Sequence, residues 1–370
     1  MTTNNLPEEL HLEILKHLSP SPKVLARASA VCREWRRVLN DPAFLLELYR
    51  TRRGAPVTQG YFDNLPLRFV HVNAGDPVRI PLDSIDHRTN WQFVDCRHGR
   101  VLLRDRSGLQ FMVWQPMTGD QHFVQDKGSC GIQNSVALIC ECAAEGGDDG
   151  PKVGQAKPCH ASHFRVVVVS NHVGTGPLHG VVFSSVTRLW SESAELPPTY
   201  QIRPEPSVVV GRMIYQPLFD YHILAFDTDK LRLATFERPK WDNVRLLNVD
   251  GDVLGLVGAL GFTLRLWVRY ADAWVMRNTI DLSNIHPPLS TAPLPKTNPR
   301  FALMPPVKII GVADGGDELF LWTMIGVFML SVESMELKKV NGTTIHHMKT
   351  VYPYGAFYIP PSTVHPKIAT

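Results

Sequence analysis

Apolar residues recur every three or four positions along the first fifty residues, and the pattern then changes. This spacing is typical of amphipathic helices. The first predicted helix begins at Leu6-Pro7, and a second begins at Ser21-Pro22, where serine caps the helix and proline fits its first turn. The pattern predicts three or four short helices within residues 1–53. Because helices this short do not persist alone, their apolar faces need the rest of the chain or another protein.

From residue 54 onward the apolar positions alternate or form short runs, which indicates strands. Several units of hairpin-like strands follow one another, and each carries an aromatic residue at the corresponding place in its third strand. These anchors are Trp114, Phe183, Phe226, Trp267 and Phe328. Their spacings are 69, 43, 41 and 61 residues.

Two stretches account for the longer spacings. When 126–160 and 283–306 are treated as insertions, the period falls to between 34 and 43 residues. A period near 40 with several strands per repeat favours propeller blades, about six of them if a unit around 67–72 is included. The predicted class is a multi-domain α+β chain, with a helical domain at 1–53 and a mostly antiparallel all-β domain at 54–370. A β-sandwich is the alternative.

Composition and charge narrow the possible functions. The 370 residues are 44% hydrophobic and 20% charged, which is ordinary for a globular protein. The net charge of +3 lies entirely within residues 1–53, which argues against a polyanion-binding protein. The N-terminus lacks the features of a secretory signal, and the longest uncharged run, 319–332, is too short to span a membrane. We therefore expect a cytoplasmic or nuclear location and no membrane partner.

A search for chemistry gives weak candidates. Cys140 and Cys142 could converge with Cys159, His160 and His163 on a zinc ion, but one residue between two cysteines is too few for a usual structural site. The stretch around Gly251–Gly261 does not match a dinucleotide fingerprint, and no phosphate-binding loop is present. We expect no metal, no cofactor and no catalysis by this chain.

The N-terminal residues resemble an F-box. The resemblance rests on three motifs: Leu6-Pro7-x-Glu9-Leu10-x-x-Glu13-Ile14-Leu15, Ala30-Val31-Cys32-Arg33-x-Trp35, and Asp41-Pro42-x-Phe44. F-box proteins are the substrate-recruiting subunits of Skp–cullin–F-box ubiquitin ligases. The resemblance implies a Skp-type adaptor as partner and, through it, a cullin. The residues that it implies at the adaptor interface are Leu6, Pro7, Leu10, Ile14, Leu15, Leu25, Val31, Cys32 and Trp35.

The body resembles the C-terminal part of a large group of plant F-box proteins, most familiar in grasses. The matching motifs are Val113-Trp114-x-Pro116-x-Thr118-Gly119, Leu266-Trp267-Val268 and Val351-Tyr352-Pro353-Tyr354. In that group the C-terminal domain is expected to hold the degradation target, a protein that the resemblance does not identify. The charge balance gives no reason to expect a nucleic acid as partner. Two alternatives to the ligase receptor stay open: a scaffold that uses the adaptor without a cullin, and an enzyme on a propeller, which the missing catalytic residues disfavour.

Overall fold

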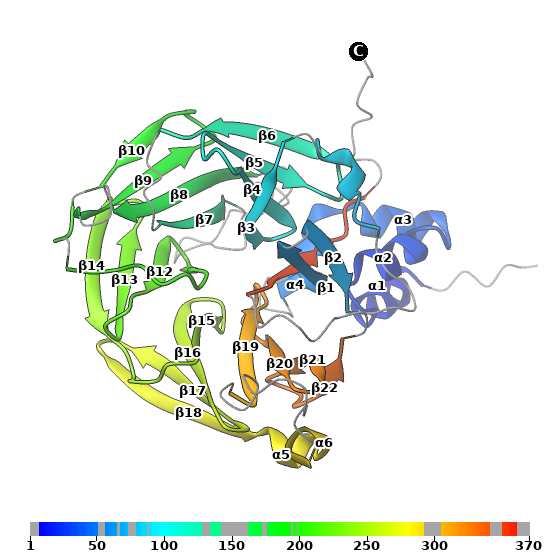
Figure 1. Cartoon of the computed structure of the whole chain (residues 1–370). Helices are drawn as coiled ribbons and strands as arrows, with labels where there is room; N and C mark the ends of the chain where they lie inside the picture. The colour runs from blue at the N-terminus through cyan, green and yellow to red at the C-terminus, as the bar shows by residue number, and fades with distance from the viewer. Residues whose placement is uncertain are drawn as a thin grey trace, which may run out of the picture.

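The computed structural model describes residues 7–50, 56–64, 67–72, 79–86, 89–127, 134–141, 162–171, 176–193, 195–197, 199–291, 305–340 and 350–360. Within these ranges helices come first and strands follow, as the change in hydrophobic period predicts. Figure 1 looks along the axis of a ring of sheets, with the N-terminal helices beside the place where the ring closes.

Four N-terminal helices share one small core. They are α1 (Glu8–Lys16), α2 (Pro22–Ser29), α3 (Arg33–Leu39) and α4 (Pro42–Arg50). Proline occupies the first position of α2 and of α4, where its missing N–H costs nothing. Fully buried leucines from the first three helices pack in one cluster.

The strands of the body form six antiparallel sheets in the described part of the chain. The first sheet combines β1 (Val57–Asn64) and β2 (Leu67–His71) with β23 (Tyr352–Ala356), and a short 3-10 turn, η1 (Leu82–Ser84), follows β2. The second contains β3 (Trp91–Arg97), β4 (Arg100–Asp105), β5 (Gln110–Gln115) and β6 (Asp120–Gln125). The third contains β7 (Asn134–Glu141), β8 (His163–Asn171), β9 (Leu178–Ser184) and β10 (Trp190–Glu192).

The other three sheets repeat the same four-stranded plan. The fourth contains β11 (Val208–Val210), β12 (Met213–Pro217), β13 (His222–Asp227) and β14 (Arg232–Glu237). The fifth contains β15 (Val244–Val249), β16 (Val253–Leu260), β17 (Thr263–Tyr270) and β18 (Ala273–Asp281), followed by α5 (Leu282–Ile285) and α6 (Pro288–Thr291). The sixth contains β19 (Val307–Val312), β20 (Glu318–Thr323), β21 (Gly326–Ser331) and β22 (Leu337–Lys339).

Pairing between distant segments closes the ring. β23 pairs antiparallel with β1, with Gly60 opposite Tyr354 and Tyr61 opposite Pro353. Each of the six boundaries between neighbouring sheets has a hydrophobic cluster with residues from both sides, including the boundaries on either side of the closing sheet. The sheets are therefore the blades of a six-bladed propeller, and the β-sandwich alternative is wrong because the sheets surround an axis and do not form two layers.

The aromatic anchors lie where the repeat pattern places them. All five are in the third strand of a blade and are buried between blades. Phe226 illustrates the reason, because a side-chain carbon at Gly180 in the neighbouring blade would lie only 2.7 Å from its ring. Treating all of 126–160 as an insertion was wrong, since β7 within it is the innermost strand of the third blade. Turn-forming residues stand on both sides of β7, with Gly128 and Gly131 before it and the glycine- and aspartate-rich run 146–150 after it, so the pattern of the whole stretch is that of a loop.

The blade boundaries should carry much of the stability. Leu224 is completely buried between two blades, so Leu224→Ala should lower the free energy of unfolding by about 2–5 kcal/mol. Leu260 is 69% exposed at the end of β16, and Leu260→Ala should change it by less than about 0.5 kcal/mol. Urea unfolding of both variants checks this. Equal effects would contradict the assignment of the core.

Candidate adaptor-binding surface and ring axis

The helical unit presents apolar side chains to solvent on α1 and on the turn before α3. Leu10 is 47% exposed, Ile14 39% and Val31 65%. Pro7 is also exposed, and Cys32 and Trp35 are half-buried. We call these six residues the apolar patch. Soluble domains usually cover such large side chains, so a group of them is a candidate surface for contact with another molecule.

Leu15 and Leu25, which the motif placed at the adaptor interface, lie instead in the core of the helical unit. Both are completely buried, in the cluster that also contains Leu39. Leu15 follows Ile14 by one position, which turns its side chain about 100° around the helix and away from the patch. Leu6 lies outside the described residues.

The patch spans two helices because α1 and α3 lie side by side. The ring of His11 on α1 meets the ring of Trp35 on α3 edge to face, with the ring centres 6.5 Å apart. The thiol of Cys32 accepts a hydrogen bond from the Trp35 N–H at 3.4 Å and so caps α3. Leu10 and Ile14 are one turn apart on α1 and therefore share a face.

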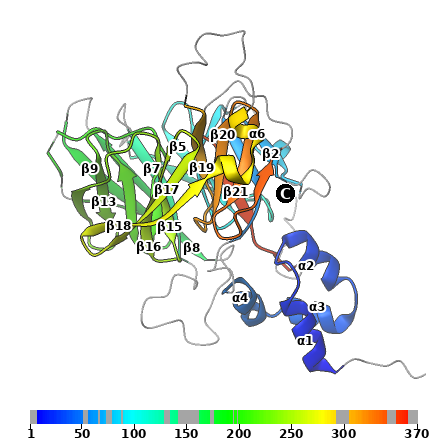
Figure 2. The ribbon, with the colours of Figure 1, turned by 90° about the horizontal axis from the view of Figure 1, so that it is seen from below.

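Tyr49 joins the helical unit to the propeller. Its hydroxyl donates a hydrogen bond to the Pro20 carbonyl at 3.1 Å and accepts one from the Tyr358 N–H at 2.7 Å. Its ring meets Phe357 edge to face at 4.6 Å between ring centres. Since Phe357 and Tyr358 directly follow the closing strand β23, the helices are held against the ring at its closure, and Figure 2 shows them below one face.

This junction defines two faces of the propeller. In a blade of four antiparallel strands, the fourth strand ends on the face of the ring where the first strand begins. The innermost strand of the next blade therefore begins on that same face, and all innermost strands run in one direction. We call the face where they begin the entry face and the face where they end the exit face. The helices lie at the exit face because β23 ends there. The strand ends Glu141 and His163 also belong to the exit face, whereas the connection from β18 to β19 belongs to the entry face. Of the two predicted insertions, the part between β7 and β8 therefore joins strand ends on the exit face, and 283–306 joins strand ends on the entry face.

Charged side chains converge on the axis at the exit face. Arg97 at the end of β3 donates from Nη1 to Asp314 Oδ1 and to the Val209 carbonyl, both at 3.3 Å. The Asp314 carboxylate also accepts from the His98 N–H at 2.6 Å. These groups come from the second, fourth and sixth blades, so the contacts cross the ring. Arg97 and Asp314 are both buried and form a matched pair.

Asp95 lies further inside, near the same axis. Burial raises the pKa of its carboxyl to about 7, while hydrogen bonds from the Leu138 and Cys96 N–H groups and the charge of Arg97 act in the opposite direction. The Asp314 carboxylate adds to the rise. A neutral Asp95 is therefore part of the packing at mildly acidic pH.

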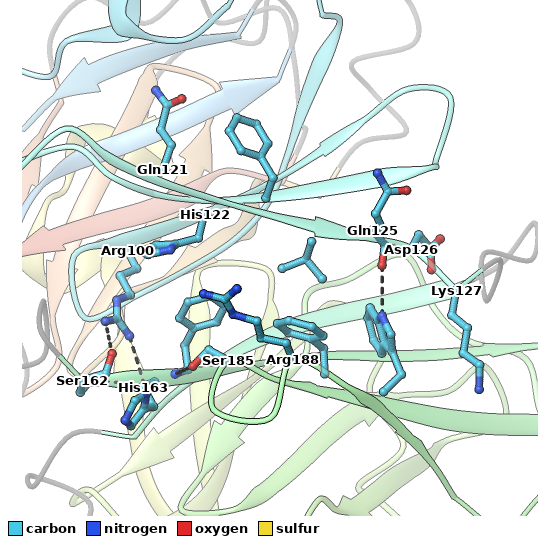
Figure 3. Close-up of a pocket in the computed structure, with 15 residues that line it drawn as sticks. Arg100, Gln121, His122, Gln125, Asp126, Lys127, Ser162, His163, Ser185 and Arg188 are labelled. Carbon is cyan, nitrogen blue, oxygen red and sulfur yellow. Dashed lines mark hydrogen bonds between the residues drawn. The ribbon is translucent and has the colours of Figure 1, made fainter. Parts of the chain in front are cut away.

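A pocket of about 840 Å³ lies on the second and third blades (Figure 3). Arg100 crosses its floor and donates to the carbonyls of Ser162 and His163 at 2.5 and 3.3 Å. Trp190 donates from its indole to the Gln125 carbonyl at 3.0 Å and forms part of the wall. Because Arg100 is already bonded to backbone carbonyls, its role here is to join the two blades.

Metal-binding geometry is absent from the described residues, where no group of three His, Cys, Asp or Glu side chains could hold an ion. Cys140 is buried in β7 beside Phe357, and its thiol meets the Arg97 carbonyl at 3.7 Å. His163, another zinc candidate, is exposed at the start of β8 opposite Glu141. The remaining zinc candidates Cys142, Cys159 and His160 lie outside the described residues. No helix in the described ranges is long and apolar enough to cross a lipid bilayer.

Comparison with known families finds a match to each of two segments of the chain. Residues 3–50 match the F-box-like family, and residues 163–361 match the family described as "F-box protein AT5G49610-like, beta-propeller". The second match alone covers more than half of the chain. The chain belongs to this family of F-box propeller proteins.

Individual relatives are distant. An Arabidopsis thaliana protein named as an F-box protein, At3g16210, is 29% identical to this F-box protein over 219 residues. The match covers 57% of this chain and only 53% of that relative, so the chain spans about half the length of the relative it matches.

Solved propellers are more distant still. The Cps50 (Swd1) β-propeller domain of Myceliophteria thermophila is 8% identical with a TM-score of 0.37, covering 67% of this chain and 72% of that one. The propeller domain of the trilobed protease from Pyrococcus furiosus is 9% identical with a TM-score of 0.35, covering 68% and 71%. At such scores the sheet topology, and not these likenesses, carries the fold assignment.

The junction residues Tyr49, Phe357 and Tyr358 did not emerge from sequence reasoning. Tyr49 follows the apolar spacing of α4 and reads as an ordinary core position. Phe357 and Tyr358 stand in the aromatic C-terminal motif, where strand-like alternation conceals a contact with the helices. Only the partners, some 300 residues apart in the chain, reveal the role of these side chains.

Tyr49→Phe should weaken the contact between the helical unit and the propeller. The substitution leaves the buried Tyr358 N–H without its acceptor, at a cost of about 1–3 kcal/mol. Hydrogen exchange of the α4 amides should become faster, while the exchange of the central blade strands stays unchanged. Tyr270→Phe, at a 54% exposed tyrosine of the outer propeller, is the matched control and should alter neither. Unchanged exchange in α4 would contradict the role of the Tyr49 hydroxyl.

Asp95 should make stability depend on pH. An unfolded aspartate titrates near about 4, so between that value and about 7 the folded protein keeps a proton that unfolding releases. The contribution of Asp95 is therefore full below pH about 4 and is lost as the pH rises through 7. The free energy of unfolding of Asp95→Asn should rise relative to that of the wild type over this range, by on the order of a few kcal/mol. Above this range the difference should stay constant.

Urea unfolding between pH about 5 and 8 measures this difference. The control is Asp272→Asn, at a fully exposed carboxylate, which should follow the wild-type curve. If the free energy of unfolding changes with pH in the same way for Asp95→Asn and for the wild type, the raised pKa of the buried Asp95 is contradicted.

Proposed function

We propose that this F-box protein is the substrate-recruiting subunit of a Skp–cullin–F-box ubiquitin ligase. F-box domains generally bind Skp adaptors, and the observation that supports this role is the apolar patch on α1 and α3. Burying a leucine or isoleucine side chain fully contributes about 1.5–3 kcal/mol. The exposed Leu10, Ile14 and Val31, with Pro7, Cys32 and Trp35 beside them, offer enough surface for a stable complex after association costs.

In this proposal the junction at Tyr49 sets the orientation of the adaptor relative to the propeller. An adaptor bound to α1 and α3 would be held in a defined orientation relative to the ring, because the same helical unit is packed on Phe357 and Tyr358. The entry face then points away from the adaptor and is available to a protein target. The receptor would act by proximity, raising the concentration of the target near a conjugating enzyme without chemistry of its own.

Leu10→Asp combined with Ile14→Asp should abolish adaptor binding and leave the chain folded, because both side chains are exposed and make no part of the core. A pull-down of the Skp adaptor with the full-length chain measures this. Leu109→Asp with Leu189→Asp, at leucines 65% and 68% exposed on the propeller, provides a matched control that should retain the adaptor. Retention of the adaptor by the α1 variant would overturn the interface.

Mass spectrometry of complexes purified from the native tissue tests the remaining steps. Adaptor and cullin lost together with the α1 double variant would support the ligase role, and proteins retained by both forms would be candidate targets. Adaptor without cullin would indicate the scaffold role.

A further inference from the structure

The pocket of about 840 Å³ has one wall from each of two neighbouring blades (Figure 3). On the second blade β6 supplies His122 and Val124, which are two positions apart and so share a face of the strand. On the third blade the wall contains three aromatic rings, those of Phe164 on β8, Phe183 on β9 and Trp190 on β10. The ring centres of His122 and Phe164 are 5.6 Å apart, and those of Phe183 and Trp190 are 5.5 Å apart. The third blade thus offers an aromatic surface to whatever occupies the pocket.

Contacts between the two blades hold these walls in place. Arg100 donates to two backbone carbonyls beside the start of β8, at 2.5 and 3.3 Å. The Trp190 indole donates to the Gln125 carbonyl at 3.0 Å, and Lys127 and Glu192 form an ion pair between the same blades. The bonds of Arg100 and Trp190 lie at opposite sides of the pocket in Figure 3. The pocket is therefore formed without a ligand, as is usual for sites that take small molecules.

The connection from β9 to β10 brings Arg188 to this pocket. Ser185 anchors the connection on β8, because its hydroxyl accepts from the Phe164 N–H at 2.8 Å and its N–H donates to the Phe164 carbonyl at 2.9 Å. The Arg188 N–H donates to the Ser184 carbonyl at 2.8 Å, which closes the turn. Figure 3 shows the Arg188 side chain in the pocket, and among the described residues its guanidinium has no hydrogen-bond or ion-pair partner.

The backbone at Arg188 is strained. Its φ is 58°, in the left-handed region that glycine adopts freely and that other residues adopt at a cost. Strain of this kind is often kept where it places a functional group. Of the described non-glycine residues with positive φ, Arg188 is the one that lines this pocket. No hydrogen bond or ion pair of its side chain within the described part of the chain offsets the strain, so a ligand of the guanidinium would explain why arginine stands here.

The charges that line the pocket favour an anion. Arg100, Lys127 and Arg188 are cations, and Asp126 is the one carboxylate among the described lining residues. Glu192 neutralises Lys127, whereas the carbonyls that bind Arg100 satisfy its N–H groups without cancelling its charge. A planar guanidinium binds a carboxylate with two parallel hydrogen bonds. The Arg188 guanidinium beside an aromatic wall therefore suits a molecule with one carboxylate and a flat apolar body.

We propose that this pocket binds a small aromatic carboxylate, with the carboxylate on Arg188 and the ring between Val124 and the aromatic rings of the third blade. The volume of about 840 Å³ lies within the range of small-molecule sites. A compact molecule fits better than an extended chain, because the bonds of Arg100 and Trp190 join the blades at two sides of the pocket. The site goes beyond the proposed function and does not depend on it, since its residues lie outside the apolar patch.

Titration calorimetry and thermal unfolding of the full-length chain test the site, with naphthoate as the probe. Naphthoate should bind saturably at one site and raise the Tm of the wild type. Acetate lacks the ring and naphthalenemethanol lacks the charge, so each should bind at least about tenfold more weakly, a difference of about 1.4 kcal/mol or more. No saturable binding of naphthoate, or binding of the neutral analogue as tight as that of naphthoate, would overturn the proposal.

Two substitutions at Arg188 separate ligand binding from a structural role. Arg188→Gln should weaken naphthoate binding at least about tenfold. Arg232→Gln, at an exposed arginine on β14, removes the same charge and is the matched control, which should bind naphthoate as the wild type does. Arg188→Gly should weaken the binding equally, yet its Tm without ligand should equal or exceed that of the wild type, because glycine accepts the positive φ. A lower Tm for Arg188→Gly, or undiminished binding by either Arg188 variant, would overturn the proposal.

A short peptide that ends in phenylalanine carries the same chemistry at the end of a polypeptide chain. This peptide should bind more weakly than naphthoate, because the rest of its chain must find room beside the bonds that join the blades. Tighter binding of the peptide would overturn the assignment to a small molecule and indicate the C-terminus of a protein instead. All of these measurements use the chain without the adaptor, so failure here and failure of the ligase proposal are distinguishable.

Discussion

Ring closure by β23 is the interaction on which the rest of the structure depends. The pairing of β23 with β1 fixes two segments almost as far apart as the described chain allows, and it gives each blade a neighbour on both sides. The strands within a blade alternate in direction, so the direction of β23 in the closing blade fixes the face on which each connection between strands lies. The position of the helical unit follows, since Phe357 and Tyr358 leave the closing strand at the exit face and pack there on Tyr49.

Much of this architecture could be predicted from the sequence, because it arises from local patterns. Helical spacing and proline positions located the first four helices, and the aromatic residue in each third strand located five blades. The prediction failed at β7, a buried strand of eight residues within a stretch treated as an insertion. It also could not separate Leu15 and Leu25 from Leu10 and Ile14, because a motif states which residue types occur and not which side of a short helix is already covered.

The charged groups on the axis could not be anticipated in the same way. Arg97, Asp314, Arg245 and Glu205 are ordinary members of strands and connections in the sequence, and they meet only because six blades bring their first strands together. Overall charge is a poor guide for the same reason, because basic and acidic residues that cancel in the body as a whole meet as buried ion pairs near the axis.

The position of β23 also bears on how this protein is made. β1 and β2 leave the ribosome early, and they must wait for a partner strand until nearly all of the blades have been synthesised. During that interval β1 has an unpaired edge, and the helical unit lacks its contacts with Phe357 and Tyr358. A ribosome-bound intermediate therefore exposes a strand edge and apolar side chains at the same time. Synthesis of β23 and of the residues directly after it thus completes the propeller and fixes the F-box in one event. A chain interrupted before β23 would present its F-box without a fixed orientation.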